Sequence, residues 1–411
     1  MKAKAKAIFP DERPTVPTIV DGSLLEGGGQ VLRNAVSYGA VLSKSVEVRN
    51  IRSNRSKPGM RAQHLTGIRL AAKICGGRLT GDEIGSRTVR YDPPSVGRPG
   101  GAEETIVGDT GTAGSICLLL QTALPCALLD ARLLSSREIH LELRGGTNAA
   151  MAPQIDYLAE VFLPVAVPLF DLPNIKLTVI RRGYYPRGGG IVRVAISPFE
   201  PGRRLRPISL TKRGRVVDVR IRSFHAGNVP RYVAQKMADA AIRRMRNESS
   251  KGLIPKELRP RVEVVTEASA VASGSGILIV ARTNTGNFLA GSALGGPIAK
   301  ADNTGMEAAE ELLRTLEDGG CVDEWLQDQL VLFMALAEGT SEILTGGLTL
   351  HTRTAIAVAE QLTGAKFEVE RLDSDPDRED ITGGDDASYG TIGRIKGRHR
   401  IRCSGIGFTR E

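Results

Sequence analysis

Strand-like segments followed by helical segments recur along most of this chain. The alternating segment VEVRNIR precedes MRAQHLTGIRLAAKIC at residues 60–75, whose apolar residues have helical spacing. TVRYDP likewise precedes the apolar run AGSICLLLQTALPCALL, and IHLELRGG at 139–146 precedes APQIDYLAEVFLPVAVPLF. This order predicts an α/β protein with helices on one face of small sheets.

Two glycine triplets indicate that these units are duplicated. EGGGQVLR at residues 26–33 and RGGGIVRV at 187–194 each place three glycines ahead of an apolar segment. Between the second triplet and the C-terminal helices, the segments follow the order strand, helix, strand, strand, helix. This order is typical of a compact α+β module. We therefore predict an α/β (α+β) fold, in which a large domain of repeated βαβα-type units (18–198 and 318–411) carries a smaller inserted α/β domain (199–317).

The charge balance favours a polyanionic partner. The 411 residues include 55 Lys and Arg against 46 Asp and Glu, a formal net charge of +9, and basic surfaces attract nucleic acid. Residues 1–17 are expected to form a disordered basic tail. The acidic and then basic stretch 373–399 is expected to be mostly an exposed loop before the last strand, and we assign it no role.

Cysteine usage and hydropathy bear on the cellular compartment. The five cysteines form no CxxC pair, which favours a reducing environment. The longest apolar segment, SICLLLQTALPCALL, is too short to span a bilayer, and no apolar stretch follows the charged N-terminus as in a secretory signal. We expect a soluble intracellular protein that does not contact a membrane.

EGGGQVLR also suggests an anion site. Consecutive glycines ahead of a helix let backbone N–H groups approach an anion closely. Glu26 could hold a metal ion and Arg33 a phosphate, although glycine triplets more often serve simple turns. A Walker-type P-loop sequence is absent from the chain, which excludes that class of nucleotide site.

A second candidate is the basic turn IRSNRSKPGMRAQHL at residues 51–65. Pro58 and Gly59 force a turn, and arginines around it can each offer two donors to a phosphate. A solvated basic loop explains the same residues equally well. The side chains concerned are Arg52, Arg55, Lys57, Arg61 and His64.

The third candidate is His351, one of five histidines, which stands just ahead of an apolar helical run in TLHTRTAIAVAEQL. A lone histidine near a helix start is more often structural. A neutral imidazole nitrogen can nevertheless attack phosphorus, because it is nucleophilic at pH 7 without first losing a proton.

Seven segments jointly resemble the RNA 3′-terminal phosphate cyclases, and the likeness is closest to the eukaryotic type. The resemblance covers roughly residues 18–411, and RGGTNAAMAPQIDY is similar to the family's signature. In chain order the segments are DGSLLEGGGQVLR, IRSNRSKPGMRAQHL, TAGSICLLLQ, RGGTNAAMAPQIDY, GYYPRGGG, VDEWLQDQLVLFMALAEG and TLHTRTAIAVAEQL.

The resemblance implies a nuclear RNA-processing enzyme that converts an RNA 3′-terminal phosphate to a 2′,3′-cyclic phosphate, using ATP and Mg²⁺ or Mn²⁺. A histidine would attack the α-phosphate of ATP, giving a histidine–AMP intermediate and releasing pyrophosphate. AMP would pass to the RNA 3′-phosphate, and the neighbouring 2′-hydroxyl would then displace AMP. Adenylation supplies the leaving group, and the vicinal hydroxyl is already positioned.

The same resemblance implies roles for individual residues. His351 matches the nucleophile and Glu26 the metal-binding acid. Trp325 stands where the family commonly has tyrosine, so an aromatic face is kept and a hydroxyl is lost. The matches to nucleotide-binding positions are Gln121, Pro153, Trp325, Asp328 and Gln329; the matches near the phosphates or the RNA end are Arg33, Arg52, Arg55, Gln63 and His64.

Two rival interpretations remain. A non-catalytic cyclase-like protein acting in rRNA processing and ribosome assembly would share the fold but lack the nucleophilic histidine. An enolpyruvyl transferase would use similar repeated units without needing such a histidine. We expect the partner to be RNA with a 3′-terminal phosphate, and we infer no obligate protein partner.

Overall fold

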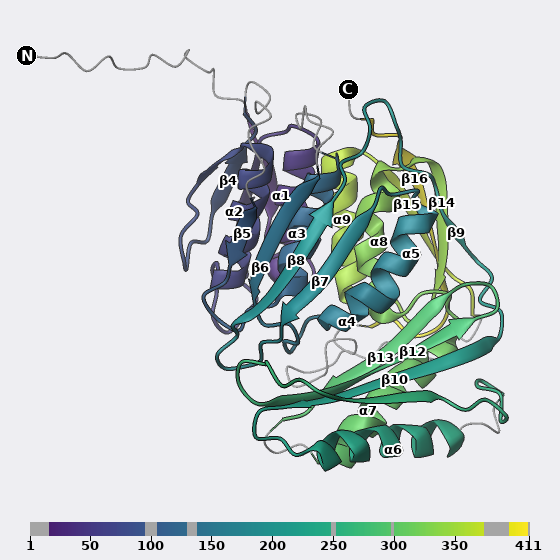
Figure 1. Cartoon of the computed structure of the whole chain (residues 1–411). Helices are drawn as coiled ribbons and strands as arrows, with labels where there is room; N and C mark the ends of the chain where they lie inside the picture. The colour runs from purple at the N-terminus through teal and green to yellow at the C-terminus, as the bar shows by residue number, and fades with distance from the viewer. Residues whose placement is uncertain are drawn as a thin grey trace, which may run out of the picture.

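Three units with the same order of elements make up most of the fold (Figure 1). The computed structural model describes residues 16–94, 105–129, 138–247, 252–296, 300–373 and 394–409. Each unit runs strand, helix, strand, helix, strand, strand. The first comprises β1 (Thr18–Asp21), α1 (Gly29–Val41), β2 (Val46–Arg49), α2 (Ala62–Cys75), β3 (Arg78–Thr80) and β4 (Val89–Asp92).

The second and third units repeat this order. The second comprises β5 (Ile106–Asp109), α3 (Ile116–Leu129), β6 (Ile139–Gly145), the continuous helical stretch α4 (Ile155–Tyr157), η1 (Leu158–Phe162) and α5 (Leu163–Leu169), then β7 (Ile175–Arg181) and β8 (Gly190–Ile196). The third comprises β9 (Ser209–Leu210), α8 (Glu324–Leu336), β14 (Glu338–Thr345), α9 (Leu350–Thr363), β15 (Lys366–Arg371) and β16 (His399–Ile406).

The sheets of the three units share one topology. In each, the first two strands pair in parallel, and the last two join as antiparallel strands, giving the orders β1-β2-β4-β3, β5-β6-β8-β7 and β9-β14-β16-β15. This repetition confirms the predicted fold class. In each unit the helices cover one face of the sheet. Residues on the other face can therefore be polar, and they alternate along the strands with the apolar residues that face the helices.

Between β9 and α8 the chain forms a further layer. It contains β10 (Val216–Ala226), α6 (Arg231–Asn247), β11 (Arg261–Thr266), β12 (Gly274–Thr283), β13 (Phe288–Leu294) and α7 (Ala301–Asp318). Helices α6 and α7 pack on one face of the sheet β11-β10-β12-β13 and enclose a hydrophobic core of their own. Figure 1 shows this layer below the three units.

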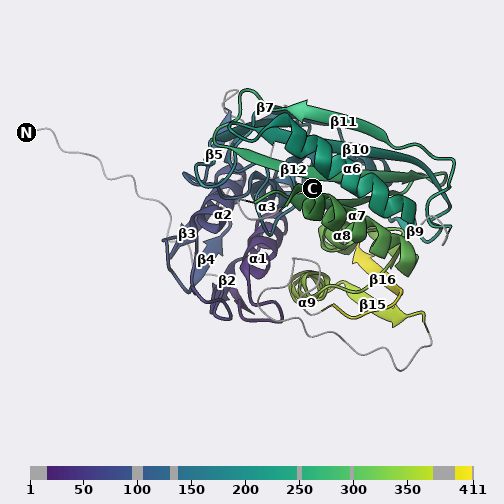
Figure 2. The same cartoon turned by 90° about the horizontal axis from the view of Figure 1, so that it is seen from below.

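The helices of the three units lie together in the middle of the molecule. Helix α1 contacts α3 and α9, and α9 contacts α8, so that these helices share the main hydrophobic core (Figure 2). Helix α3 is apolar on all sides and almost fully buried, as expected of a helix surrounded by other elements. The central position of α1, α8 and α9 brings their ends close to one another.

The predicted domain boundaries, the predicted N-terminal tail and the predicted loop at 373–399 can be compared with the structure only in part. The division into 18–198, 199–317 and 318–411 stays a prediction, but β9 pairs with β14 and so belongs to the third unit. Of the predicted tail, residues 1–15 lie outside the described part of the chain. Residues 374–393 of the predicted exposed loop also lie outside it, whereas Arg394 and His399 are buried, 8% and 3% exposed, which corrects the expectation for that end.

Candidate active site

His351 lies at the start of α9, held by the cap of that helix. The Thr349 hydroxyl accepts a hydrogen bond from the Thr352 backbone N–H at 3.1 Å, which caps the helix. The His351 Nδ1 atom lies 2.9 Å from Oε1 of Gln30 in α1. Burial lowers the pKa of the His351 imidazole to about 4, with Glu26 opposing and Arg33 adding to the effect. The ring is therefore neutral at neutral pH.

Gln30 also fixes which ring nitrogen of His351 carries the proton. The Gln30 amide nitrogen donates to Oδ2 of Asp328 in α8 at 2.6 Å, so the amide oxygen must be the group that faces His351. An amide oxygen only accepts, and the neutral ring therefore places its proton on Nδ1. The lone pair is left on Nε2, which is the nitrogen available for nucleophilic attack.

Burial raises the pKa of the Asp328 carboxyl to about 7, while the charge of Arg33 acts in the opposite direction. Asp328 is 8% exposed. Helices α1, α8 and α9 thus bring Gln30, Asp328 and His351 together from three distant parts of the chain. Gln30 is the residue that sequence analysis missed, although it lies within EGGGQVLR; its contact with His351 spans 321 positions.

The glycine triplet lets the chain pass between the side chains of Glu26 and His64. Gly27 has φ +59°, in the left-handed region that favours glycine. A Cβ atom at Gly28 would lie 2.0 Å from the carboxylate of Glu26, and one at Gly29 would lie 2.2 Å from Nε2 of His64. The three glycines are therefore needed to bring Glu26 and His64 to the start of α1.

Glu26 has one engaged and one free oxygen. Its Oε1 forms an ion pair with Arg55, and its backbone N–H donates to the Thr354 hydroxyl of α9 at 3.2 Å. Its Oε2 is buried and has no hydrogen-bond partner. An orphaned carboxylate oxygen of this kind can bind a hard cation, although the described residues contain no group of three or more His, Cys, Asp or Glu that could hold a metal by themselves.

The arginines predicted to bind phosphate lie around His64. Burial lowers the pKa of His64 to about 3, and the nearby charges of Arg33 and Arg52 lower it further. Arg52 Nη1 donates to the backbone oxygens of Lys57 and Gly59, at 2.8 and 2.9 Å, and so also braces the basic turn. Cations crowd this region: burial lowers the pKa of Arg52 too, with a contribution from its neighbours Arg61 and Arg55.

Gln63 takes part differently from its neighbours. Its side-chain oxygen accepts from the backbone N–H of Ser115, at the entry to α3, with a distance of 3.1 Å. It therefore fixes the start of α3, in the second unit, against α2. The structure gives Gln63 this structural contact and does not test the phosphate role that was predicted for it.

The predicted nucleotide-binding residues line two neighbouring hollows. Gln121, Asp328 and Gln329 border a narrow apolar cleft with Gln30, and Oε1 of Gln329 is buried without a hydrogen-bond partner. Trp325 lines a second cavity of about 400 Å³, together with Ala152 and Gln154 on either side of Pro153. Gln329 Nε2 donates to the backbone oxygen of Trp325 at 2.6 Å, so the two hollows share one turn of α8.

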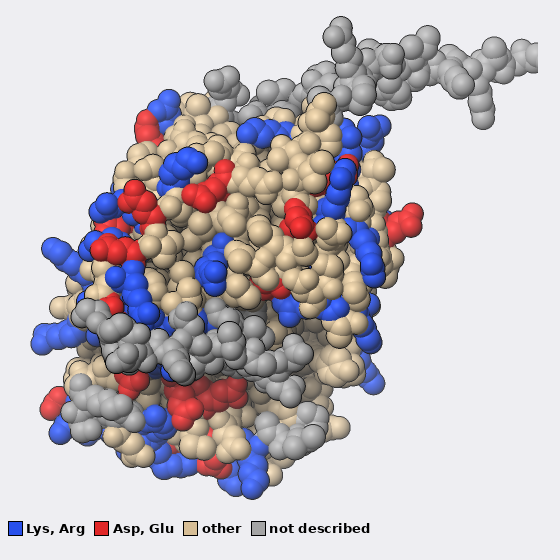
Figure 3. Space-filling view, turned by 180° about the vertical axis from the view of Figure 1, so that it is seen from behind, with Lys and Arg blue, Asp and Glu red and all other residues tan. Residues whose placement is uncertain are grey.

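Trp325 still makes a side-chain hydrogen bond, even though it lacks the tyrosine hydroxyl. Its indole Nε1–H donates to Glu311 of α7. Burial raises the pKa of Glu311 to about 8. Glu307 and Glu310 line the same cavity, and acidic side chains gather in the lower half of the view from behind, where α7 lies (Figure 3).

Comparisons with known proteins agree on one family. The sequence model of the RNA 3′-terminal phosphate cyclases matches residues 24–369. The chain belongs to the RNA 3′-terminal phosphate cyclase family. A cyclase of this name from Methanothermobacter thermautotrophicus is 40% identical over 352 residues, which is 86% of this chain and 96% of the relative.

Eukaryotic members of the cyclase family match as well. An RNA 3′-terminal phosphate cyclase from Drosophila melanogaster is 38% identical, and the match covers 85% of this chain and 92% of the Drosophila protein. A probable RNA 3′-terminal phosphate cyclase from Dictyostelium discoideum is 37% identical, and the match covers 86% of this chain and 78% of the Dictyostelium protein. None of the helices in the described residues is long and apolar enough to cross a membrane.

Proposed function

We propose that this protein converts the 3′-terminal phosphate of RNA to a 2′,3′-cyclic phosphate at the expense of ATP, with His351 as the nucleophile. The observation that carries the proposal is the neutral His351 ring, whose Nδ1 faces the Gln30 oxygen at 2.9 Å, which puts the lone pair of the ring on Nε2. The family relationship supports the same reaction.

In the first step Nε2 attacks the α-phosphorus of ATP. A nitrogen–phosphorus bond forms, the bond to the bridging oxygen breaks, and pyrophosphate leaves. The ring then carries positive charge, which the Gln30 oxygen stabilises through the Nδ1 proton. Asp328 holds Gln30 in this orientation through the 2.6 Å contact, as carboxylates do for catalytic groups elsewhere.

In the second step an oxygen of the RNA 3′-phosphate attacks the same phosphorus, and the nitrogen–phosphorus bond breaks. His351 returns to its neutral form, favoured by the burial that depresses its pKa to about 4. In the third step the 2′-hydroxyl oxygen attacks the 3′-phosphorus, loses its proton, and AMP leaves. The hydroxyl is held beside its target by the ribose, which removes most of the entropic barrier.

We assign the basic residues to the phosphates and the RNA end. Arg33 and Arg55 influence the protonation of His351 electrostatically and so lie near enough to stabilise charge on the transferring phosphate. Arg52, Gln63 and His64 border the same region and would meet the RNA end. The charge of Arg33, Arg52 and Arg55 is consistent with the +9 balance of the chain and with binding that weakens as salt rises.

The two hollows along α8 suit the nucleotide. The cavity of about 400 Å³ beside Trp325 and Pro153 could take the base against the indole face. Gln121, Asp328 and Gln329 would meet the sugar and α-phosphate, and the unpartnered Gln329 oxygen suits a hydroxyl donor. This arrangement would direct the α-phosphate toward His351 on the adjacent helix α9.

Glu26 fits a divalent cation because its buried Oε2 lacks a partner. Mg²⁺ is often held by one or two carboxylates together with substrate phosphates, so a single acid suffices here. Mg²⁺ or Mn²⁺ bound there would neutralise charge on the triphosphate. Arg55, paired with the other oxygen, keeps Glu26 aimed at the same point.

The direct test uses an RNA carrying a labelled 3′-phosphate, incubated with protein, ATP and Mg²⁺. The expected product resists phosphatase and becomes sensitive after acid opens the ring. Folded protein that leaves the label fully sensitive would instead favour the non-catalytic, ribosome-assembly interpretation. We also propose a nuclear location, as inferred from the likeness to the eukaryotic type; imaging of a tagged chain tests it.

A further inference from the structure

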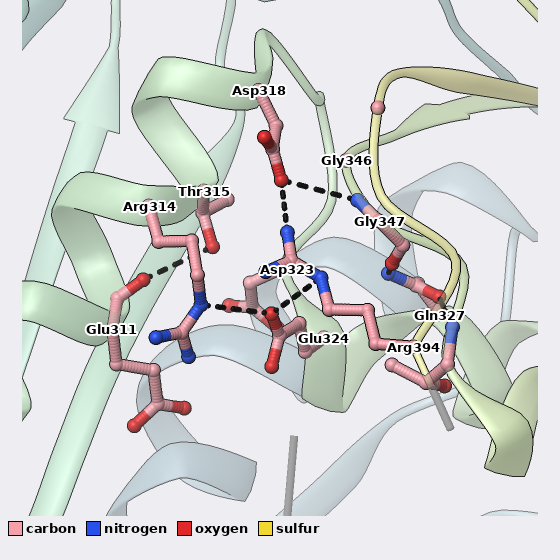
Figure 4. Close-up of polar contacts among 12 residues, drawn as sticks. Glu311, Arg314, Thr315, Asp318, Asp323, Glu324, Gln327, Gly346, Gly347 and Arg394 are labelled. Carbon is pink, nitrogen blue, oxygen red and sulfur yellow. Dashed lines mark hydrogen bonds and ion pairs between the residues drawn. The ribbon is translucent and has the colours of Figure 1, made fainter. Parts of the chain in front are cut away.

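Arg394 is a buried cation that the proposed reaction does not use. It lies in the stretch 373–399, to which we assigned no role from the sequence, and its side chain is 10% exposed. Its guanidinium reaches two carboxylates from different elements, Asp318 at the end of α7 and Glu324 at the start of α8 (Figure 4). A buried arginine between the buried Glu324 and the half-buried Asp318 is costly to separate from either acid, because its charge would then be left unpaired.

The same cluster holds the backbone just ahead of α9. Asp318 Oδ2 accepts the Gly347 backbone N–H at 3.1 Å while it pairs with Arg394. A Cβ atom at Gly347 would lie 2.0 Å from Nε of Arg394, so the guanidinium packs directly on this glycine. Next along the chain, Leu348 pairs with Ile395 through two backbone hydrogen bonds of 2.8 and 2.9 Å.

Gln327 continues the connection from Gly347 to the cap of α9. It is fully buried, and its Nε2 donates to the Gly347 oxygen at 3.0 Å. Its Oε1 accepts from the Thr352 hydroxyl at 2.9 Å and from the Thr349 backbone N–H at 3.4 Å. Thr349 is the N-cap of α9, and His351 is the second residue of that helix.

The cluster also reaches the wall of the large cavity. Glu324 accepts from Arg314 of α7 at 3.2 Å, and both residues line the cavity beside Trp325. Figure 4 shows Arg314 and Arg394 approaching Glu324 from opposite sides. Arg394 is therefore the shared partner of a cavity-wall carboxylate and of the loop that precedes His351.

We propose that Arg394 is a positioning residue: through Asp318 and Gly347 it clamps residues 346–349 and so sets the orientation of His351 toward the α-phosphate of ATP. The inference rests on the proposed function for its chemistry, but the clamp itself is a property of the fold. Arg394 acts at a distance, through the loop, and makes no contact with the substrate.

The first test measures the clamp without any nucleotide. Hydrogen–deuterium exchange of the amides of residues 346–352 is compared in the wild type, Arg394→Gln and Asp318→Asn. Both variants are expected to exchange faster there. Arg400→Gln is the matched control, because Arg400 also pairs with two carboxylates, Glu342 and Glu370, but on the outer face of the third sheet. Unchanged exchange at 346–352 in both variants would overturn the proposal.

The second test measures protein–AMP formation in a single turnover over a range of ATP concentrations. Arg394→Gln and Asp318→Asn are expected to lower the rate at saturating ATP by about 10- to 100-fold, since a misplacement of about 1 Å has that effect. The half-saturating ATP concentration should change far less than the rate. Arg394→Lys should recover part of the rate, because it keeps the charge but not the two-sided geometry.

The outcomes separate the two claims. If the wild type forms no protein–AMP, the proposed function fails, and the exchange data alone decide on the clamp. If the wild type reacts and Asp318→Asn, shown to be folded by its thermal transition, reacts at the wild-type rate, the positioning role is overturned. A uniform loss of stability in the Arg394→Gln variant with normal single-turnover rates in its folded fraction would overturn it too.

Discussion

His351 Nδ1 lies 2.9 Å from the side-chain oxygen of Gln30. This contact determines the tautomer of the ring, and with it the identity of the nucleophilic nitrogen. Because Asp328 accepts from the other end of the Gln30 amide, the glutamine cannot flip without losing both hydrogen bonds. The chemistry of the site thus depends on Gln30, which contacts His351 at Nδ1 and not at the nucleophilic Nε2.

Replacing Gln30 with leucine should slow protein–AMP formation by about 100-fold, the scale of a lost orienting partner. Leucine fills the same space but leaves Nδ1 without an acceptor, so the proton is no longer confined to that nitrogen. The measurement is the single-turnover rate with labelled ATP. Gln361→Leu, on the exposed side of α9, is the control. Wild-type rates in Gln30→Leu would refute the tautomer argument.

Asp328→Asn should stabilise the protein at pH 8 but not at pH 4. Folding raises the pKa of this carboxyl from 3.8 to about 7, so the folded state binds a proton that the unfolded state has already lost. Stability from this group therefore falls as pH rises from about 4 to 7. Relieving that cost should add on the order of 4 kcal/mol at pH 8.

The measurement for Asp328→Asn is urea unfolding at pH 4, 6 and 8. The exposed Asp109→Asn variant serves as control, and it should shift stability little at any of these values. An Asp328→Asn variant that is less stable than the wild type at pH 8 would show that the attraction of the Arg33 charge for the carboxylate outweighs the cost of burying it.

Glu26→Gln should raise the Mg²⁺ concentration needed for half-maximal protein–AMP formation by about 10-fold or more, because a ligand charge is lost. The variant also leaves Arg55 without its ion pair, so Arg55→Ala should be measured beside it. Glu47→Gln removes a comparable ion pair with Arg49 on the first sheet and should leave the Mg²⁺ dependence unchanged. An unaltered Mg²⁺ titration in Glu26→Gln would exclude Glu26 as a ligand.

Trp325→Ala should raise the half-saturating ATP concentration by about 5- to 100-fold, the range for a lost stacking contact. Trp325→Phe keeps an aromatic face but loses the hydrogen bond to Glu311, so its effect should be smaller. ATP titrations of the single-turnover rate give both values. Equal effects of the two substitutions would mean that the hydrogen bond, not stacking, is what the indole contributes.

The repeated units could be predicted because their signals are local. Periodicities of two and 3.6 residues identify strands and helices within a few positions, and the apolar run of α3 is unmistakable. The two-residue strand β9 is too short to leave such a signal, and its pairing with β14 crosses the whole inserted layer. Periodicity therefore could not show that β9, which follows the predicted domain boundary at residue 199, pairs with the third unit.

The partners of the site residues were beyond sequence reasoning for a different reason. Gln30 is 321 positions from His351, and nothing local distinguishes it from a surface glutamine. Arg394 is followed by further basic residues, a pattern that favours a solvated loop; its burial follows from Asp318 and Glu324, which lie far away in the chain. Long-range packing determines these partners and this burial, and local sequence patterns do not reveal it.

In the proposed reaction, His351 Nε2 becomes covalently bonded to AMP. Incubating the protein with α-labelled ATP and Mg²⁺ in the absence of RNA, followed by denaturing electrophoresis, tests it most directly. We expect a protein-bound label that is stable to alkali, labile to acid, and absent in a folded His351→Ala variant. A label that persists in His351→Ala, or no label on folded wild-type protein, would contradict it.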